Sequence, residues 1–410
     1  MEQVETIIVG GGQAGLSVSY YLTQQGHNHL ILDQAAQPGE AWRNHRWDSF
    51  TFVTPNWMIR LPGAEYSGDD PDGFLPQAQI VAYFEAYVAR FFLPIRYGVR
   101  VTAVEPTPDG YRVQTDNGPF SARQVVIATG SFQQPKIPAF HTQFPPEIRQ
   151  LHSGNYRNPA QLPAGAVLVV GSAQSGCQIA EELYQSGRKV YLCVGKAGRV
   201  PRRYRGRDST WWLHTMGGYD RTVDKLPSPK ARFAGNPHVS GKDGGHTLNL
   251  HQFARDGVTL LGHIRGVDGD DILLAGDLRE NLAFVDKFEA DLLVMIDQYI
   301  RNNGLDFPEE TLPVLRDGYT QEPIERLDWR TAGITTVIWA TGYTFDYSLV
   351  QLPIFDDDGY PRQTRGVTEA PGLYFVGLNW LHSAKSTLLL GVGEDAAHVA
   401  SAIAARKSLR

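Results

Sequence analysis

Two glycine-rich turns have residue types and a spacing that suit the binding of a diphosphate. The two copies lie at a constant offset of 161 residues and read Gly10-Gly11-Gly12-Gln13-Ala14-Gly15 and Gly171-Ser172-Ala173-Gln174-Ser175-Gly176. In such a turn the first glycine permits a tight bend, the second lets a pyrophosphate approach the backbone, and the third lets a helix pack closely on a strand. The helix N-terminus that follows offers free N–H groups and a partial positive charge to the phosphates. Each turn therefore predicts a dinucleotide site.

The elements around the turns repeat as well. We expect short apolar strands at 4–9 and 166–170 and helices at 16–25 and 177–186, with Gly26 and Gly187 ending the helices. A single glycine-rich turn is a weak signal, but two copies with the same flanking elements in register are much more specific. The alternative is a strand–turn–helix unit that binds nothing.

The two copies differ in the residue that would meet a ribose. Asp33 lies 18 residues after Gly15, near the spacing of a carboxylate that holds ribose hydroxyls, and Gln34 follows it. The same count from Gly176 reaches Val194, whose side chain cannot accept a hydrogen bond. We therefore expect FAD at the first turn, with Asp33 and Gln34 as candidate contacts.

Basic residues crowd the segment after the second copy. They are Lys196, Arg199, Arg202, Arg203, Arg205 and Arg207, and no acid intervenes before Asp208. Arginine forks bind a 2′-phosphate, whereas an acid would repel one. This pattern predicts NADP at the second turn, with NADPH preferred over NADH and with Lys196, Arg202 and Arg203 as candidate contacts. A solvated basic loop is the alternative.

Two apolar strands end in the same three residues, Ala128-Thr129-Gly130 and Ala340-Thr341-Gly342. Such strand ends suit the points where the chain passes between two nucleotide-binding domains. We expect Thr129, Gly130, Ala340, Thr341 and Gly342 near the nucleotides. A purely structural role is the alternative for the two threonines.

The composition narrows the class of protein. The 410 residues, 42% hydrophobic and 20% charged, predict a globular protein of two or three domains. The net charge of −6 gives no reason to expect nucleic acid as a partner. No apolar run approaches the ~20 residues that cross a bilayer, and no metal-ligand spacing such as HExxH is present. The two cysteines form no CxxC pair, so we expect a reducing, cytoplasmic setting.

The order of these motifs resembles that of the flavin-containing monooxygenases. Ala340-Thr341-Gly342-Tyr343 is similar to the ATGY element of that family and of the N-hydroxylating monooxygenases. His152-Ser153-Gly154-Asn155-Tyr156 resembles the end of its FxGxxxHxxxY fingerprint, although Pro146 and Ile148 stand at the Phe and Gly positions. Gly372-Leu373-Tyr374-Phe375-Val376-Gly377 looks like the last flavin-contacting strand. The resemblance covers nearly the whole chain.

For the fold, the resemblance implies an α/β protein with two Rossmann-like, three-layer dinucleotide-binding domains. The NAD(P) domain, 161–330, is expected as an insertion in an FAD domain made of 1–160 and 331–410. Residues 205–257 are too long for a plain connection and are expected to form a lid-like insertion. A later helix carries one apolar face that packs in the core, forms a homodimer contact or caps a substrate. This face is made of Leu282, Val285, Phe288, Leu292, Ile296 and Tyr299.

For the activity, the resemblance implies a flavin monooxygenase. NADPH would reduce the flavin, dioxygen would add to give a hydroperoxide, and a small organic substrate would take one oxygen at sulfur, nitrogen or a keto group. The alternatives are an NAD(P)H-dependent flavin reductase or dehydrogenase without oxygen insertion, and a non-catalytic flavin-bearing redox sensor. The absence of CxxC argues against the disulfide reductases that share this plan, because those enzymes need a thiol pair.

The resemblance also implies residues around the flavin. Gly39-Glu40-Ala41-Trp42-Arg43 is similar to a GGxW element, with Glu40 at the second glycine and Trp42 packing near the flavin or in the core. Asn56 would bind the cofactor and steady the oxygenated flavin, or it would form a turn. Gly377 would end the last flavin strand.

The C-terminal region adds two further candidates. A helix that begins near Ser386 would bring Leu388 to the flavin, with its N-terminus aimed at the ring carbonyls. His382 is a candidate proton shuttle, and a structural histidine is the alternative. In the second turn, Gln174 would meet the nicotinamide nucleotide.

Overall fold

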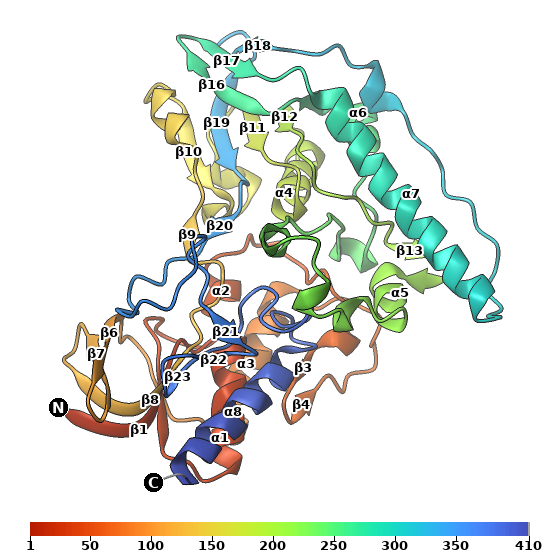
Figure 1. Ribbon diagram of the computed structural model, residues 1–410. Helices are drawn as coiled ribbons and strands as arrows, with labels where there is room; N and C mark the ends of the chain where they lie inside the picture. The colour runs from red at the N-terminus through yellow and green to blue at the C-terminus, as the bar shows by residue number, and fades with distance from the viewer. Residues whose placement is uncertain (409–410) are drawn as a thin grey trace.

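A computed structural model describes residues 1–408 and contains two parallel sheets, one above the other in Figure 1. The centre of the first sheet has the order β5-β2-β1-β8-β23, and every neighbouring pair in it is parallel. These strands are β1 (Glu2–Val9), β2 (His29–Leu32), β5 (Ile95–Arg96), β8 (Phe120–Ile127) and β23 (Leu373–Phe375). Antiparallel strands extend it: β6 (Val101–Thr107), β7 (Gly110–Thr115), β21 (Gln363–Thr364) and β22 (Val367–Thr368).

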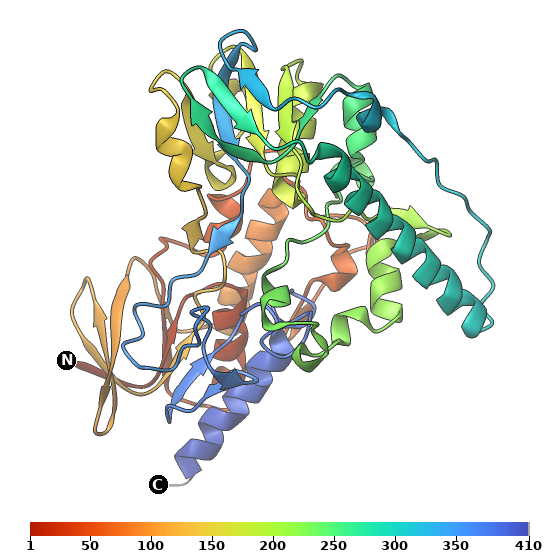
Figure 2. The same ribbon diagram turned by 45° about the horizontal axis from the view of Figure 1, so that its top comes forward.

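Three helices accompany the first sheet. They are α1 (Gln13–Gln24), α3 (Gln77–Phe91) and α8 (Val392–Ser408), and a small hairpin is formed by β3 (Arg60–Leu61) and β4 (Ala64–Glu65). Helices α1 and α8 lie side by side in Figures 1 and 2 and share one apolar cluster with the sheet. The buried side chains of Leu16 and Ile403 belong to it, so the end of the chain is packed against its beginning.

The second sheet has the order β10-β19-β11-β12-β15, and all of its pairs are parallel. Strand β11 reads as an unbroken apolar run with every residue buried, because helices and loops cover both faces of such a sheet. The strands are β10 (Arg149–His152), β11 (Ala166–Val170), β12 (Val190–Cys193), β15 (Thr259–Leu261) and β19 (Ile334–Trp339). The helices are α4 (Gln174–Gln185), α6 (Leu250–Arg255) and α7 (Leu278–Asn302), and an antiparallel flap contains β16 (Ile264–Asp268), β17 (Asp271–Leu274) and β18 (Arg326–Asp328).

The repeat seen in the sequence is present in the backbone. Helices α1 and α4 are both 12 residues long and begin at Gln13 and Gln174, which keeps the offset of 161. Gly26 and Gly187 follow the two helices with positive φ angles of 62° and 84°. The helices begin three residues before the expected starts, because the last residues of each glycine turn form the first helical turn. The fold class expected from the sequence, with two Rossmann-like units, is confirmed.

Strands β10 and β19 lie on the other side of the expected domain boundaries. The expected boundaries place residues 149–152 and 334–339 in the first unit, yet both strands pair in the second sheet. The two crossing segments pair with each other instead, as β9 (Gln134–Pro135) and β20 (Tyr343–Thr344). We propose domain boundaries at these crossings rather than at 160/161 and 330/331. Residues 409–410 of the last expected segment lie outside the described part.

The segment from 205 to about 249 runs between the two units, in green in Figures 1 and 2. It contains α5 (Ser209–Thr215) and several short 3-10 turns. A hairpin of β13 (Arg203–Tyr204) and β14 (Arg207–Asp208) lies at its start, directly before α5. We propose this range as the insertion, since α6 packs in the core of the second unit through Leu250 and Phe253. On α7 the expected apolar face is buried at Leu282, Val285, Leu292 and Ile296, whereas Phe288 is 37% exposed. No helix within 1–408 has the length and apolarity to span a membrane.

Two dinucleotide cradles and the contacts between them

The first turn requires glycine at two of its positions. Gly10 has a φ of 105°, and a Cβ there would stand 2.6 Å from the carbonyl oxygen of Ala128. A Cβ at Gly15 would stand 1.9 Å from the oxygen of Gly10. At Gly12, by contrast, a Cβ would meet no atom within 4 Å. The backbone there is open, which leaves room for a pyrophosphate to approach.

The second turn has the same geometry. Gly171 also has a φ of 105°, and its Cβ would stand 2.6 Å from the oxygen of Ala340. A Cβ at Gly176 would stand 1.8 Å from the oxygen of Gly171. Neither α1 nor α4 has a side chain that caps its N-terminus. The free N–H groups at both helix starts therefore fit an anionic ligand.

The Ala-Thr-Gly strand ends close each turn from one side. Ala128 donates its N–H to the oxygen of Val9 at 2.8 Å, and Ala340 donates to that of Val170 at 2.9 Å. The hydroxyl of Thr341 donates to the carbonyl of Lys136, which holds the two crossing segments together. Gly130 and Gly342 have φ angles of 73° and 81°, so each strand turns sharply where it leaves its sheet. The segments are thus placed beside the cradles as expected.

The ribose ends of the two copies are built differently. In the first copy, Asp33 accepts the N–H of Gly11 at 2.7 Å through its carboxylate, and burial raises the pKa of this carboxyl. In the second copy the direction of the bond is reversed, since the hydroxyl of Ser172 accepts the N–H of Gly195 at 2.9 Å. Gln34 lies exposed beside Asp33. The first cradle therefore has a carboxylate at its strand end, where the second has Val194, and the second has a hydroxyl in its turn, where the first has Gly11.

The basic run after the second copy is partly buried and partly exposed, and each of its six side chains has a partner. Arg202 is 2% exposed, forms an ion pair with Asp208 at 2.5 Å and donates to the carbonyl of Val53 at 2.8 Å. Arg203 donates to two carbonyls, those of Gly244 and Gly245. The other partners are Asp286 and Glu289 for Arg199, Asp297 for Arg205, the ring of Trp211 for Arg207, and Glu280 for Lys196.

Of the two expected arginine contacts to the phosphate, Arg202 is engaged by other groups, and Arg203 is exposed with two loop carbonyls as partners. The guanidinium of Arg202 is enclosed between the insertion and the first unit, where it also lies 4.7 Å from the ring centre of Phe74. A buried guanidinium that has a carboxylate and a carbonyl as partners is not free to bind a phosphate. Lys196, three residues after β12, is exposed and its partner is the exposed carboxylate of Glu280, so it is the remaining candidate for a phosphate contact.

The residues expected near the flavin include two that are fixed by local packing. Trp42 lies in α2 (Glu40–Arg43), with its ring centre 5.2 Å from that of Phe52. Glu40 begins this helix behind Gly39, whose φ of 75° makes the turn, so the missing second glycine is tolerated. The carboxylate of Glu40 accepts the amide of Asn44 at 2.9 Å.

Asn56 is buried and both ends of its amide are taken. Its nitrogen donates to the carbonyl of Asp70 at 2.8 Å, and its oxygen accepts the N–H of Leu75 at 2.9 Å. Because both the nitrogen and the oxygen of this amide are already bonded, the side chain holds the loop 70–75 in place. Asn56 therefore positions the loop 70–75.

Gly377 and Thr387, which precedes Leu388, both contact the start of α1. A Cβ at Gly377 would stand 2.6 Å from that of Ala14, and the side chain of Gln13 donates to the carbonyl of Thr387. The helix expected from Ser386 begins only at Val392. The hydroxyl of Ser386 accepts the N–H groups of His382 and Ser383, which holds this stretch in turns instead.

The insertion touches both cradles. At the second, the amides of Gln174 and Gln178 both donate to the carbonyl of Val239, at 2.8 and 2.9 Å. Beside the first, in the C-terminal segment whose Thr387 contacts Gln13, Val223 donates its N–H to the carbonyl of His382 at 2.9 Å. Lys385 forms ion pairs with Asp220 of the insertion and Glu394 of α8, both at 2.6 Å. One segment therefore spans the two candidate cofactor sites.

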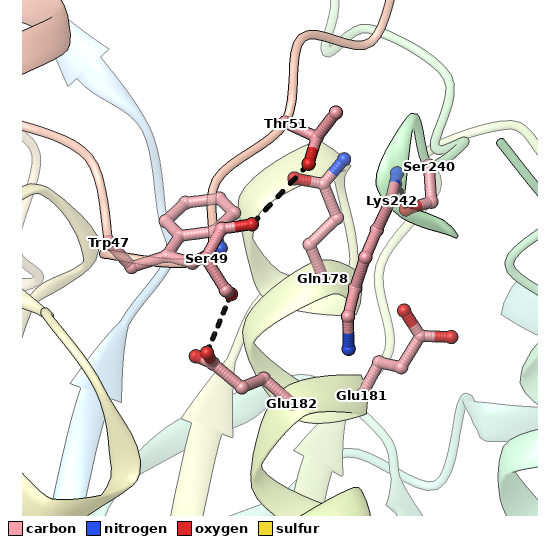
Figure 3. Close-up of a pocket in the computed structure, with 8 residues that line it drawn as sticks. All are labelled: Trp47, Ser49, Thr51, Gln178, Glu181, Glu182, Ser240 and Lys242. Carbon is pink, nitrogen blue, oxygen red and sulfur yellow. Dashed lines mark hydrogen bonds between the residues drawn. The ribbon is translucent and has the colours of Figure 1, made fainter. Parts of the chain in front are cut away.

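A small pocket between the two units shows how they are joined (Figure 3). Ser49 donates to the carboxylate of Glu182 at 2.6 Å, and the hydroxyl of Tyr156 donates to the other oxygen of that group at 2.6 Å. Glu181 pairs with His246 of the insertion at 2.7 Å, and this bond raises the pKa of the imidazole. These residues were absent from the sequence-based site, because contacts between distant elements leave no local pattern.

Two motifs that carried the resemblance also meet. The ring of His152 lies 4.6 Å from that of Tyr343, and its Nε2 is 2.9 Å from the carbonyl oxygen of Gly342. Burial lowers the pKa of His152, which favours the neutral imidazole. The motifs therefore stabilise the crossing between the units.

Two uncapped helix N-termini, each behind a glycine turn at the carboxyl edge of a parallel sheet, define a protein that binds two dinucleotides. The sequence pattern of the pyridine nucleotide-disulphide oxidoreductase family matches residues 7–214, and the chain belongs to this family.

Relatives extend the likeness over the whole chain. An uncharacterized CzcO-like oxidoreductase of Geobacillus kaustophilus is 33% identical over 398 residues, which are 97% of each chain. A probable indole-3-pyruvate monooxygenase, YUCCA3 of Arabidopsis thaliana, is 26% identical over 425 aligned residues, 98% of this chain and 86% of that one. The structure of a flavin-containing monooxygenase from Stenotrophomonas maltophilia matches with a TM-score of 0.66 at 22% identity, over 99% of both chains.

These findings confirm the resemblance to the flavin-containing monooxygenases. The protein is an oxidoreductase of this family whose cofactors are FAD and NADP(H). The fit of each cofactor rests on this chain's own residues, namely the glycine turns, the free helix starts and the open backbone at Gly12.

Proposed function

We propose that the protein consumes NADPH and transfers one atom of dioxygen to sulfur, nitrogen or a keto group of a small organic molecule. The observation that carries this proposal is the chemistry of its two cysteines. Cys177 and Cys193 are buried, and burial raises the pKa of both thiols, that of Cys193 to about 12. Because the thiolate is the reactive form, neither residue suits the transfer of electrons to a disulfide. This supports an acceptor other than a disulfide.

The cofactors would be held by groups already described. The first turn, Asp33 and Gly377 would hold FAD, and the second turn would hold the nicotinamide coenzyme. When bound, the flavin supplies the acceptance of a hydride and the activation of dioxygen. The remaining tasks of the chain are to orient the two cofactors and to keep water out.

The insertion is suited to the exclusion of water. It bonds to Gln174 at the second cradle and to His382 at the first, so it covers the space between the two cofactor sites. His382 remains the candidate for moving a proton, since its N–H and carbonyl are held by Ser386 and Val223 while the side chain is half-buried. Asn56 acts as a positioning residue for the loop 70–75.

The test compares NADPH consumption with product formation under air and without oxygen. Suitable probes are thioanisole for sulfur, N,N-dimethylaniline for nitrogen and cyclohexanone for a keto group. The relative named as an indole-3-pyruvate monooxygenase supports the addition of a 2-oxo acid. We expect one probe class to give product in proportion to the NADPH consumed, and only in air. Steady NADPH oxidation with hydrogen peroxide as the sole product from every probe would instead indicate a flavin reductase.

A further inference from the structure

The end of β12 holds a cluster of charges that the function described so far does not use. Lys196 pairs with Glu280 at 2.6 Å, and these side chains are 50% and 68% exposed. His263, which follows β15, lies 2.5 Å from the carboxylate of Asp277. The amide of Asn281 donates to the carbonyl of Val194 at 3.0 Å. Three segments thus meet at this edge of the second sheet.

The cluster lies beside the second cradle. Gly195 donates its N–H to the hydroxyl of Ser172 in the glycine turn, and Lys196 is the next residue. In the first copy the corresponding strand end carries Asp33, which bonds to its own turn. A ribose bound in the second cradle, in the way expected of the first, would therefore face Lys196 and its partner Glu280.

We propose that Glu280 limits the preference of this protein for NADPH over NADH by competing for Lys196. A phosphate monoester carries about two negative charges at neutral pH, so a 2′-phosphate is attracted to the lysine and repelled by the carboxylates of Glu280 and Asp277. The 2′-hydroxyl of NADH meets no such repulsion, and a carboxylate accepts a hydrogen bond from it. This inference rests on the proposed use of NADPH, and it names Glu280 as the residue that weakens the preference for NADPH.

The charge balance supports this assignment. The two acids offset the single lysine. Further along the chain, Arg199, Arg202 and Arg205 form ion pairs with acids, whereas Arg203 donates to two carbonyls and Arg207 lies over the ring of Trp211. Binding of a 2′-phosphate must therefore displace Glu280, whereas binding of NADH can leave the ion pair in place. Because the pair is exposed, its removal changes affinity by a few-fold and does not threaten folding.

The experiment measures the dissociation constants of NADP⁺ and NAD⁺ by titration of the oxidised, FAD-loaded protein, without turnover. We expect Glu280→Gln to tighten NADP⁺ about three- to tenfold and to leave NAD⁺ unchanged or weaker. Lys196→Ala should weaken NADP⁺ about tenfold and NAD⁺ less than about twofold. Asp291→Asn serves as the matched control, since Asp291 forms an exposed pair with Lys287 on the same helix at 2.7 Å.

If Glu280→Gln leaves the ratio of the NADP⁺ and NAD⁺ dissociation constants unchanged, the proposal is overturned. Oxygen transfer is not measured here, so the proposed activity can fail while the binding ratio still responds to Glu280. Conversely, if the protein transfers oxygen but Glu280→Gln does not change the ratio of the NADP⁺ and NAD⁺ dissociation constants, only this inference is contradicted.

Discussion

Gly10 and Gly171, at the same place in two turns, share a φ of 105° and each faces an alanine carbonyl at 2.6 Å from the position of a Cβ. An L-residue at either position meets both an unfavourable backbone angle and a backbone clash. A substitution at either position should therefore disturb one cofactor site and leave the other intact.

Gly10→Ala should release FAD and leave a colourless protein, and Gly171→Ala should keep FAD while its dissociation constant for NADP⁺ rises about ten- to hundredfold. Flavin absorbance and NADP⁺ titration measure the two effects. Gly118→Ala is the control, because Gly118 has a φ of 104° but no atom within 4 Å of its Cβ. Retention of FAD by Gly10→Ala would contradict the assignment of the first cradle.

The bond between Ser49 and Glu182 predicts a link between the stabilities of the two units. Hydrogen bonds to a charged group contribute about 1.5–3 kcal/mol, so Ser49→Ala should lower the free energy of unfolding by a similar amount. Denaturant unfolding measures it. Ser401→Ala removes only an exposed bond within α8 and should change the free energy by less than about 0.5 kcal/mol. Equal effects of the two changes would speak against an interface contribution.

The pair of His246 and Glu181 predicts a dependence of stability on pH. Because the bond to Glu181 raises the pKa of His246, its stabilising effect is fully present below the ordinary value of 6.5 and is lost as the pH rises through the raised value. We expect the unfolding temperature to fall over this window more in the unchanged protein than in His246→Gln. Parallel curves for the two proteins would show that this pair does not control the effect.

Arg202 and Lys196 should respond differently to removal. Arg202→Ala leaves the carboxylate of Asp208 buried without its partner, which costs about 3–5 kcal/mol of stability and raises the Michaelis constants for NADPH and NADH together. Lys196→Ala should affect NADPH far more than NADH. A selective effect of Arg202→Ala on NADPH would return the 2′-phosphate contact to the arginine.

The sequence was sufficient to place those candidate cofactor contacts that depend on neighbouring residues. The glycine turns, Asp33 and the Ala-Thr-Gly strand ends lie where their spacing predicted, because each is confined to one strand–turn–helix unit. The family and its cofactors were predicted correctly for the same reason.

Pairing between distant segments could not be predicted in this way. Strands β10 and β19 join the second sheet across more than 180 residues, and no local signal marks that choice. The ion pair of Arg202 depends on Asp208 and on the loop at Val53, which only the folded chain brings together. The bond from Gly195 to Ser172 could not be predicted either, because the hydroxyl of a serine in a turn can bond to any of several nearby groups.

The central claim is that reduced cofactor and dioxygen together oxygenate a small molecule on this protein. The most direct measurement is the mass of the product formed by FAD-loaded protein and NADPH under ¹⁸O₂ in ordinary water. One heavy oxygen atom in each product molecule is the predicted result. Product that contains only ¹⁶O, or NADPH oxidation that yields labelled hydrogen peroxide and no oxygenated product, would contradict the claim.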